Sequence, residues 1–144
     1  MKRLPDHITD IHREMLSSVL LAAALSGEKI LDVYSTDFSV DYKEDNLPLT
    51  LADTRPHEVI SSRFACLFPD IPIISEEGTK TSYEDRKNMD RFWLVDPLDG
   101  TKNFIKKNGE FTVNIALVEN NKPVLGMVYI PASGTVYYSD GKNV

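Results

Sequence analysis

The sequence has 144 residues, with 16 Lys and Arg against 22 Asp and Glu, a net charge of −6 and 42% hydrophobic residues. This balance excludes a disordered or collagen-like chain, and the length suits one domain with a single core. The acidic charge argues against nucleic acid as the main partner, because phosphate neutralisation needs clustered Lys and Arg, and no apolar run approaches the roughly 18 residues of a transmembrane segment.

The first predicted element is one long amphipathic helix. Apolar residues step by threes and fours from Ile8 to Val33, and the single gap in this pattern falls at Ser26. Asp6 or Thr9 would cap the start of this helix.

Two short extended pieces are predicted next. Polar and apolar residues alternate from Phe38 to Tyr42, and after a polar connector the segment Leu47 to Leu51 includes Pro48, which suits an edge strand. Asp53 then stands before a second helix, with Pro56 in its first turn. One side of this helix is apolar: Val59, Ile60, Phe64 and Leu67.

A lone cysteine, Cys66, lies among apolar residues of this second helix, and we expect it in the core. A single Cys cannot form an internal disulfide, which favours a reducing compartment. We therefore expect the protein in the cytoplasm, either free or peripheral to the inner face of the membrane. The three histidines show no metal-ligand spacing and are expected at the surface.

The rest of the chain is rich in predicted strands. Short β-branched or aromatic runs cover Ile71 to Ser75, Phe92 to Val95, Thr112 to Glu119, Pro123 to Ile130 and Thr135 to Ser139. Hairpin turns are expected at residues 120–122 and 132–134. Helices followed by an antiparallel meander predict an α+β fold, an antiparallel sheet with two long helices on one face.

The most informative motif runs from Trp93 to Phe104, where a hydrophobic strand leads into Asp96-Pro97-Leu98-Asp99. Hard cations such as Mg²⁺ prefer several oxygen ligands, and this segment offers two carboxylates and the Leu98 carbonyl. Gly100 lets the backbone pass close to a ligand, and the amides after it can face an anion. Asp and Asn also form ordinary turns, so a solvated turn is the alternative reading.

Two further acidic segments can also be interpreted either as part of a metal site or as ordinary structural features. Glu76 and Glu77 follow an apolar strand, so adjacent strands would bring Glu76 next to Asp96; the alternative is an acidic surface loop. Asp53 follows Thr50-Leu51-Ala52 and serves either as a helix N-cap or in the same site, or as both.

Together these segments resemble the lithium-sensitive, Mg²⁺-dependent phosphatases that include inositol monophosphatase, fructose-1,6-bisphosphatase and 3'(2'),5'-bisphosphate nucleotidase. The three matching motifs occur in family order: residues 48–53, 75–77 and 93–101. Residues 43–46 and 104–117 are most similar to the bacterial nucleotidases of the CysQ type, which remove the 3'-phosphate of adenosine 3',5'-bisphosphate in sulfate assimilation or nucleotide salvage.

The resemblance implies that two or three Mg²⁺ ions are cofactors. Glu76, Asp96 and the Leu98 carbonyl would hold one ion, and Asp96 and Asp99 would share a second. Glu77 would be secondary. Thr101 would orient the attacking water, with Asp53 accepting the hydroxyl proton of Thr101.

The substrate implied by the resemblance is a small phosphate ester, adenosine 3',5'-bisphosphate. The amides near Gly100 and Thr101 would hold its phosphate, so the substrate-binding set is Glu76, Leu98, Asp99, Gly100 and Thr101, and the catalytic set is Asp53, Thr101 and Glu76. Inositol monophosphatase activity is the alternative within the family. A non-catalytic metal- or phosphate-binding fragment is the alternative outside it.

The resemblance covers only about the first half of the family's length. Residues 1–144 would form its N-terminal metal-binding α+β domain, while the later Trp-Asp motif and the C-terminal α/β domain with most of the nucleoside pocket are absent from this chain. A further alternative is an assembly subunit that pairs with another chain through an uncovered sheet edge, for example in a homo-oligomer.

Overall fold

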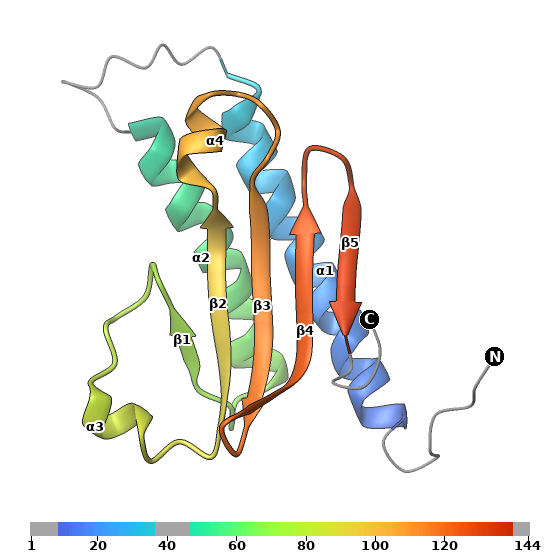
Figure 1. The fold of residues 1–144 in the computed structure, drawn as a ribbon, viewed down its shortest axis with the longest axis vertical. Coiled ribbons are helices and arrows are strands. Elements are labelled where there is room, and N and C mark those ends of the chain that lie inside the picture. The colour runs from blue at the N-terminus through green and yellow to red at the C-terminus, as the bar shows by residue number, and fades with distance from the viewer. Residues whose placement is uncertain (1–8, 37–46, 140–144) are drawn as a thin grey trace.

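A five-stranded sheet and two long helices dominate the computed structural model, which describes residues 9–36 and 47–139 (Figure 1). The elements in chain order are α1 (Thr9–Tyr34), α2 (Leu47–Leu67), β1 (Ile73–Ser75), α3 (Tyr83–Arg86), β2 (Arg91–Asp99), α4 (Thr101–Ile105), β3 (Thr112–Glu119), β4 (Lys122–Ile130) and β5 (Thr135–Ser139).

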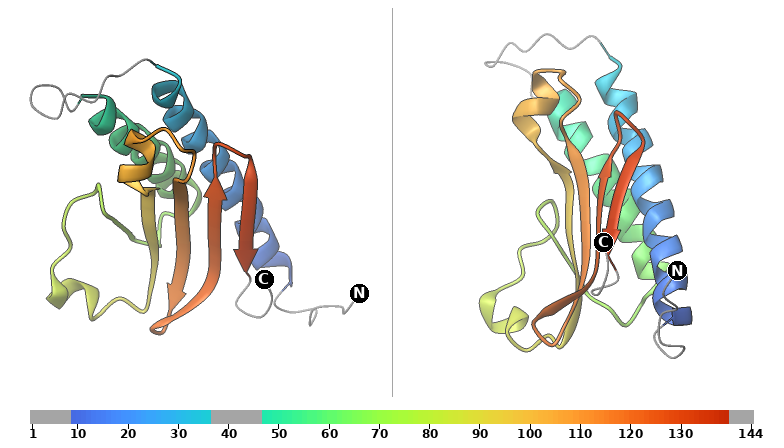
Figure 2. Two further views of the ribbon diagram at one scale, coloured as in Figure 1. Left: turned by 45° about the horizontal axis from the view of Figure 1, so that its top comes forward. Right: turned by 45° about the vertical axis from the view of Figure 1, so that its right-hand side comes forward.

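The strands lie side by side in chain order, and both long helices pack on the same face of the sheet (Figure 2). α1 contacts β3 and β4, while α2 contacts β1 and β2, and the two helices contact each other. The predicted α+β arrangement is therefore confirmed. No helix within residues 9–36 and 47–139 is both long enough and apolar enough to cross a membrane.

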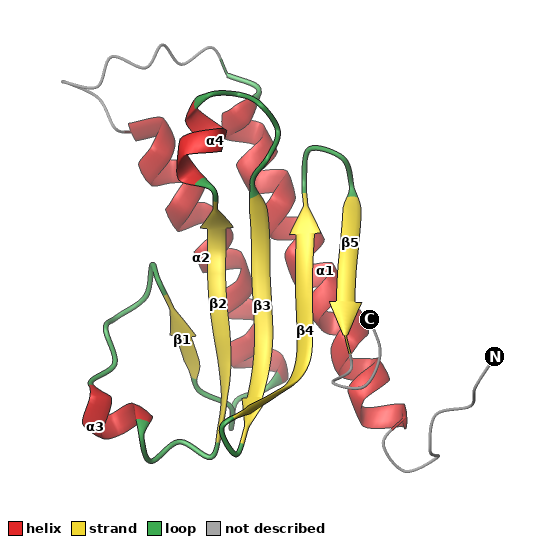
Figure 3. Cartoon of the chain, viewed as in Figure 1, coloured by secondary structure: helices red, strands yellow, loops and turns green. Residues whose placement is uncertain are grey.

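Strands β2 to β5 form the predicted antiparallel meander (Figure 3). Asn120 and Asn121 adopt positive φ angles of 49° and 62° in the turn between β3 and β4, a conformation that Asn tolerates in tight hairpins. Gly134, with φ 68°, closes the next turn. Both predicted hairpins are confirmed.

The prediction of a wholly antiparallel sheet is wrong at one edge, because β1 runs parallel to β2. Parallel neighbours need a crossover connection, and here residues 76–90 carry the chain back to the start of β2. This connection contains α3, a short helix that the sequence patterns did not predict. Ser82 caps α3 by accepting a hydrogen bond from the Asp85 N–H at 3.1 Å.

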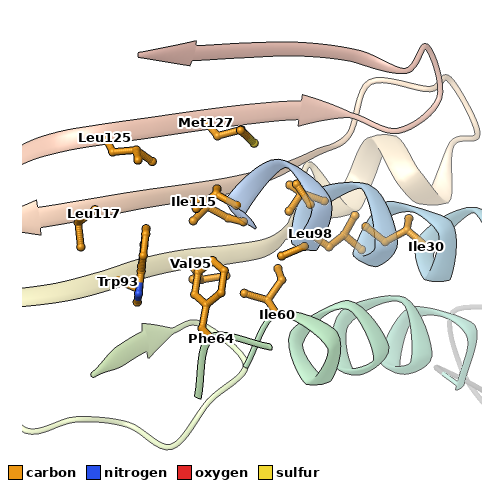
Figure 4. Packing of buried hydrophobic residues seen from close by; sticks show 14 of the residues in the cluster. Ile30, Ile60, Phe64, Trp93, Val95, Leu98, Ile115, Leu117, Leu125 and Met127 are labelled. Carbon is orange, nitrogen blue, oxygen red and sulfur yellow. The ribbon is translucent and has the colours of Figure 1, made fainter. Parts of the chain in front are cut away.

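The core lies between the helices and the sheet, as Figure 4 shows. Five of the apolar positions predicted for the first helix are buried: Met15, Val19, Ala22, Ile30 and Val33. Ser26 is also fully buried, and its hydroxyl donates to the Ala23 carbonyl at 2.8 Å. This local bond satisfies the hydroxyl, so the gap in the apolar pattern does not interrupt the packing.

Two aromatic clusters attach the helices to the sheet at separate places. The ring centroid of Phe64 in α2 lies 4.6 Å from the ring centroid of Trp93 in β2. The ring centroids of Tyr34 in α1 and Phe111 are 4.9 Å apart, and those of Phe111 and Phe104 in α4 are 5.4 Å apart. The second cluster holds the short helix α4 in place after β2, and it thereby sets the position of the chain at residues 100 and 101.

The second helix begins earlier than the sequence predicts. The segment Leu47 to Leu51 is helical, so the predicted extended piece is wrong, and Asp53 lies inside α2 instead of capping it. Pro56 is also an interior residue of this helix, although its ring removes one backbone donor. Ala52 and Pro56 are both buried, so tertiary packing outweighs the local signal of the two prolines.

Other predictions for this region have different outcomes. Cys66 is exposed, not in the core, and Leu67 is 47% exposed. Cys66 lies two positions beyond the buried Phe64, and a two-residue step turns a side chain to nearly the opposite side of a helix. The predicted cap Asp6 and the predicted extended piece Phe38 to Tyr42 lie outside the described residues.

Candidate functional site

The parallel pairing of β1 and β2 places acidic residues at one level of the sheet. Ser75, the last residue of β1, is in register with Val95, and the Glu76 N–H donates to the Val95 carbonyl at 3.3 Å. Glu76 therefore leaves β1 beside Asp96 of β2. An antiparallel pair would have put these two residues at opposite ends of the strands.

A β-bulge brings Asp96 and Asp99 to the same face of the sheet. Asp96 pairs with Asn114 and Asp99 pairs with Thr112, so β2 advances three residues while β3 advances two. Three regular positions would place the two aspartates on opposite faces, because side chains alternate along a strand. The extra residue of the bulge corrects this alternation, and Leu98 and Pro97 are buried within it.

Asp53 reaches the same site from α2. Burial first, and then the negative charges of Glu77, Asp96 and Glu76 in that order, raise its pKa from the ordinary value of 3.8 to about 7. These three carboxylates belong to β2 and to the loop after β1, so the structure brings together acidic residues that lie 23 to 43 positions from Asp53 in the sequence.

The pKa of Asp96 is raised for the same two reasons, burial and nearby negative charge. Burial first, then the charges of Glu76 and Asp99, raise the pKa of Asp96 from 3.8 to about 6, although a hydrogen bond from the Leu98 backbone lowers it. One carboxylate oxygen, Asp96 Oδ1, is buried without a hydrogen-bond donor. Like charges packed this closely oppose the ionisation of one another.

These residues fit a divalent metal ion by the chemistry of their donors. They supply hard carboxylate oxygens, an unpaired buried oxygen and excess negative charge, which are what Mg²⁺ requires. Within residues 9–36 and 47–139, no three His, Cys, Asp or Glu side chains are already arranged around one metal position. Glu76 and Asp99 are both exposed at the edge of the site.

Gly100 and Thr101 follow the carboxylates directly. Gly100 has a φ of 88°, and a Cβ at this position would lie 2.8 Å from the Glu110 carbonyl oxygen. Only glycine fits this close approach. Thr101 is half-buried and begins α4, which places its backbone immediately after the two aspartates.

Two polar residues of the site were not identified from the sequence. Asn114 in β3 donates from Nδ2 to Asp99 Oδ2 at 3.1 Å; the available signal was an Asn inside a strand, where this residue is unfavourable. His57, expected at the surface, is half-buried, and its Nδ1 lies 2.9 Å from Ser75 Oγ. No ligand spacing marks such a pair because the two residues meet only in the fold.

A groove on the helix-free face of the sheet borders this site. Its volume is about 710 Å³, and its lining includes Glu76, Asp96 and Asn114 at one end. The remainder is mostly apolar, with Leu94 and Val128 exposed by 47% and 39%. The acidic residues therefore lie beside a larger uncovered apolar surface.

The chain matches known proteins over most of its length. A model of the inositol monophosphatase family matches residues 12–143. The chain is 50% identical over 131 residues to the 3'(2'),5'-bisphosphate nucleotidase CysQ of Salmonella typhimurium, covering 89% of this chain and 53% of that protein. It is 41% identical over 129 residues to the CysQ nucleotidase of Haemophilus influenzae, covering 90% and 48%. The chain thus spans about half the length of these curated relatives.

Solved structures give the same result for the fold. The crystal structure of CysQ from Bacteroides thetaiotaomicron, described as a bacterial member of the inositol monophosphatase family, matches with a TM-score of 0.76 and 45% identity, covering 88% of this chain and 46% of that one. An inositol monophosphatase from Zymomonas mobilis matches with a TM-score of 0.76 and 26% identity, covering 92% and 49%. The match along residues 12–143 and the shared fold show that this chain belongs to the inositol monophosphatase family.

Proposed function

We propose that the protein acts as a Mg²⁺-dependent phosphomonoesterase on adenosine 3',5'-bisphosphate, with AMP and phosphate as products. The observation that carries the proposal is the position of Glu76 beside Asp96, with Asp99 brought to the same face by the bulge. The substrate is proposed from the relatives, which are named as 3'(2'),5'-bisphosphate nucleotidases.

The proposed ligand set uses the acidic residues described above. Glu76, Asp96 and the Leu98 carbonyl would hold one Mg²⁺, and Asp96 and Asp99 would share a second. Two or three such ions, when bound, would lower the pKa of water and neutralise charge on the departing oxygen. The unpaired oxygen of Asp96 and the raised pKa of this residue support the assignment.

Thr101 and Asp53 would act together in proton transfer from the attacking water. The Thr101 hydroxyl would orient the attacking water, and Asp53 would accept the hydroxyl proton. A pKa of about 7 suits Asp53 to proton transfer near neutrality. The backbone amides at Gly100 and Thr101 would donate hydrogen bonds to the substrate phosphate. The oxygens of Glu76, Leu98 and Asp99 only accept hydrogen bonds, so they would bind the phosphate through the Mg²⁺ that they hold, which would keep the phosphorus in line with the water.

We further propose that residues 1–144 correspond to the N-terminal, metal-binding half of a two-domain phosphatase. The support is the coverage of the relatives, about half in each case. The other half would complete the metal site and the nucleoside pocket. A cytoplasmic location is proposed because the lone thiol of Cys66 is exposed, and a free exposed thiol suits a reducing compartment.

Phosphate release by the complete gene product containing this chain tests the proposal. We expect hydrolysis of adenosine 3',5'-bisphosphate in Mg²⁺, with loss of activity in EDTA, in Li⁺ or in Asp96→Asn. Asp70→Asn, at an exposed position away from the site, is the matched control and should retain activity. If the wild-type protein releases no phosphate in Mg²⁺, the proposed enzyme activity is rejected and a non-catalytic binding module is favoured.

Inositol monophosphatase activity is the second candidate, because a solved relative with the same fold is an inositol monophosphatase. The ratio of kcat/KM for adenosine 3',5'-bisphosphate and for myo-inositol 1-phosphate separates the two. We expect a higher kcat/KM for the nucleotide. A higher kcat/KM for the inositol ester would instead identify the activity as that of an inositol monophosphatase.

A further inference from the structure

We propose that Asn114 is a positioning residue for the metal-binding carboxylates, an inference that rests on the proposed Mg²⁺-dependent function. Asn114 lies on β3 directly opposite Asp96 of β2. Its side-chain Nδ2 donates to Asp99 Oδ2 at 3.1 Å. One residue is thus in register with the first aspartate and hydrogen-bonded to the second.

The contact with Asp99 determines which way the amide points. A carboxylate only accepts hydrogen bonds, so the NH₂ group of Asn114 must face Asp99 and the amide oxygen must face away. This bond holds the exposed Asp99 carboxylate in one orientation next to the bulge. Without it, the Asp99 side chain would be free to turn toward solvent and away from Asp96.

The other half of the amide supplies an independent observation. Asn114 Oδ1 is buried and has no donor, and the same is true of Asp96 Oδ1 on the facing strand. A buried acceptor without a partner is unfavourable, because it has lost its contact with water without gaining a hydrogen bond. A hydrated divalent cation at these residues would satisfy both oxygens and also compensate the carboxylate charges. A lone neutral water could donate to both oxygens but would leave those charges uncompensated.

The position of Asn114 in the sheet offers no packing reason for a polar residue. On the β4 side, Asn114 is paired with Val128, which is 39% exposed in the apolar groove. An aliphatic residue at 114 would extend this apolar row and suits a strand better than Asn. The polar side chain therefore serves the carboxylates, not the packing of the sheet.

The test compares Asn114→Leu with the wild-type complete gene product. Leu is close to Asn in shape but has neither donor nor acceptor. We expect the Kd for Mg²⁺ by isothermal titration calorimetry to rise about tenfold, as loss of an outer-shell partner typically does. Thermal unfolding in EDTA should show an equal or higher Tm, and the Tm increase on adding Mg²⁺ should shrink.

A purely structural role would give the reverse pattern, with a lower Tm in EDTA and an unchanged Kd for Mg²⁺, and that result would overturn the inference. Thr112→Val is the matched control: Thr112 lies on the same strand opposite Asp99, and its replacement should leave the Kd unchanged. Asn114→Thr, which suits a strand, is judged by the same Kd if the Leu variant does not fold. A wild-type protein that binds no Mg²⁺ would reject the proposed function itself, while tight binding by both proteins would reject only the role of Asn114.

Discussion

The imidazole of His57 joins α2 to the end of β1, where its Nδ1 atom lies 2.9 Å from Ser75 Oγ. Ser61, one turn further along α2, places its hydroxyl 3.3 Å from the other ring nitrogen of His57. Asp53 precedes His57 by about one helical turn, and Glu76 follows Ser75 directly. The contact therefore links the helix that carries one acidic residue of the site to the strand that positions another.

Loss of this contact should destabilise the fold moderately. We expect Ser75→Ala to lower the free energy of unfolding in urea by about 1 kcal/mol, the usual net value of one hydrogen bond. Ser62→Ala is the control, because the Ser62 hydroxyl donates to the Val59 carbonyl within its own helix. In a double-mutant cycle with His57→Phe, fully additive effects would show that the two side chains are not coupled.

Stability without metal should fall as the pH rises. The pKa values of Asp53 and Asp96, about 7 and about 6, lie above the ordinary value of 3.8. The stabilising contribution of each protonated group is fully present below pH 3.8 and is lost as the pH rises through the folded-state value, because the unfolded chain ionises more easily. The Tm in EDTA should therefore decrease between pH 4 and pH 7.

The same titration with Mg²⁺ supplies the control for this pH effect. A bound cation favours the ionised carboxylates, so the decrease in Tm should become smaller or vanish. Asp53→Asn should flatten the metal-free profile, because it removes the group with the largest shift. An equal slope in the wild-type protein and the variant would contradict the raised pKa of Asp53.

Asp96→Asn should separate stability from activity. Removal of the charge relieves repulsion with Glu76 and Asp99, so we expect a higher Tm in EDTA. The same change removes a proposed ligand of both metal ions, so Mg²⁺ should no longer raise the Tm and phosphate release should fall by at least about 100-fold. A lower Tm in EDTA would indicate that Asp96 is needed for the fold instead.

Gly100→Ala should affect both the fold and the site. The φ of 88° is unfavourable for alanine, and the new Cβ would meet the Glu110 carbonyl oxygen at 2.8 Å. We expect a loss of about 1–3 kcal/mol in the free energy of unfolding, measured in urea, with a higher KM because α4 and Thr101 shift. Gly134→Ala, at φ 68° in open space, separates backbone strain from steric contact and should cost less.

Cys66 should react readily and be dispensable. Its thiol is exposed on α2, so a thiol reagent such as 5,5'-dithiobis(2-nitrobenzoic acid) should modify the folded protein within minutes. Cys66→Ser should change the free energy of unfolding by no more than about 0.5 kcal/mol. Slow modification that speeds up only in urea would mean that the thiol is buried in solution.

Much of the sheet could be predicted from local patterns. The bounds expected for Thr112 to Glu119 and for Thr135 to Ser139 coincide with β3 and β5, because alternating β-branched residues and Asn or Gly turns are signals contained within a few neighbouring positions. Local signals failed where packing opposes them. Leu47 to Leu51 and Pro56 look extended or helix-initial in isolation, yet they form part of α2, whose Ala52 packs into the core.

The sequence by itself determined which acidic residues are candidates, since Asp53, Glu76, Asp96 and Asp99 stand in recognisable motifs. Only the tertiary structure decided how they meet. The parallel pairing of β1 with β2, the bulge after Asp96 and the contact of Asn114 with Asp99 depend on register between distant strands. Register follows from which faces become buried together, and that is a property of the whole packed sheet instead of any one segment.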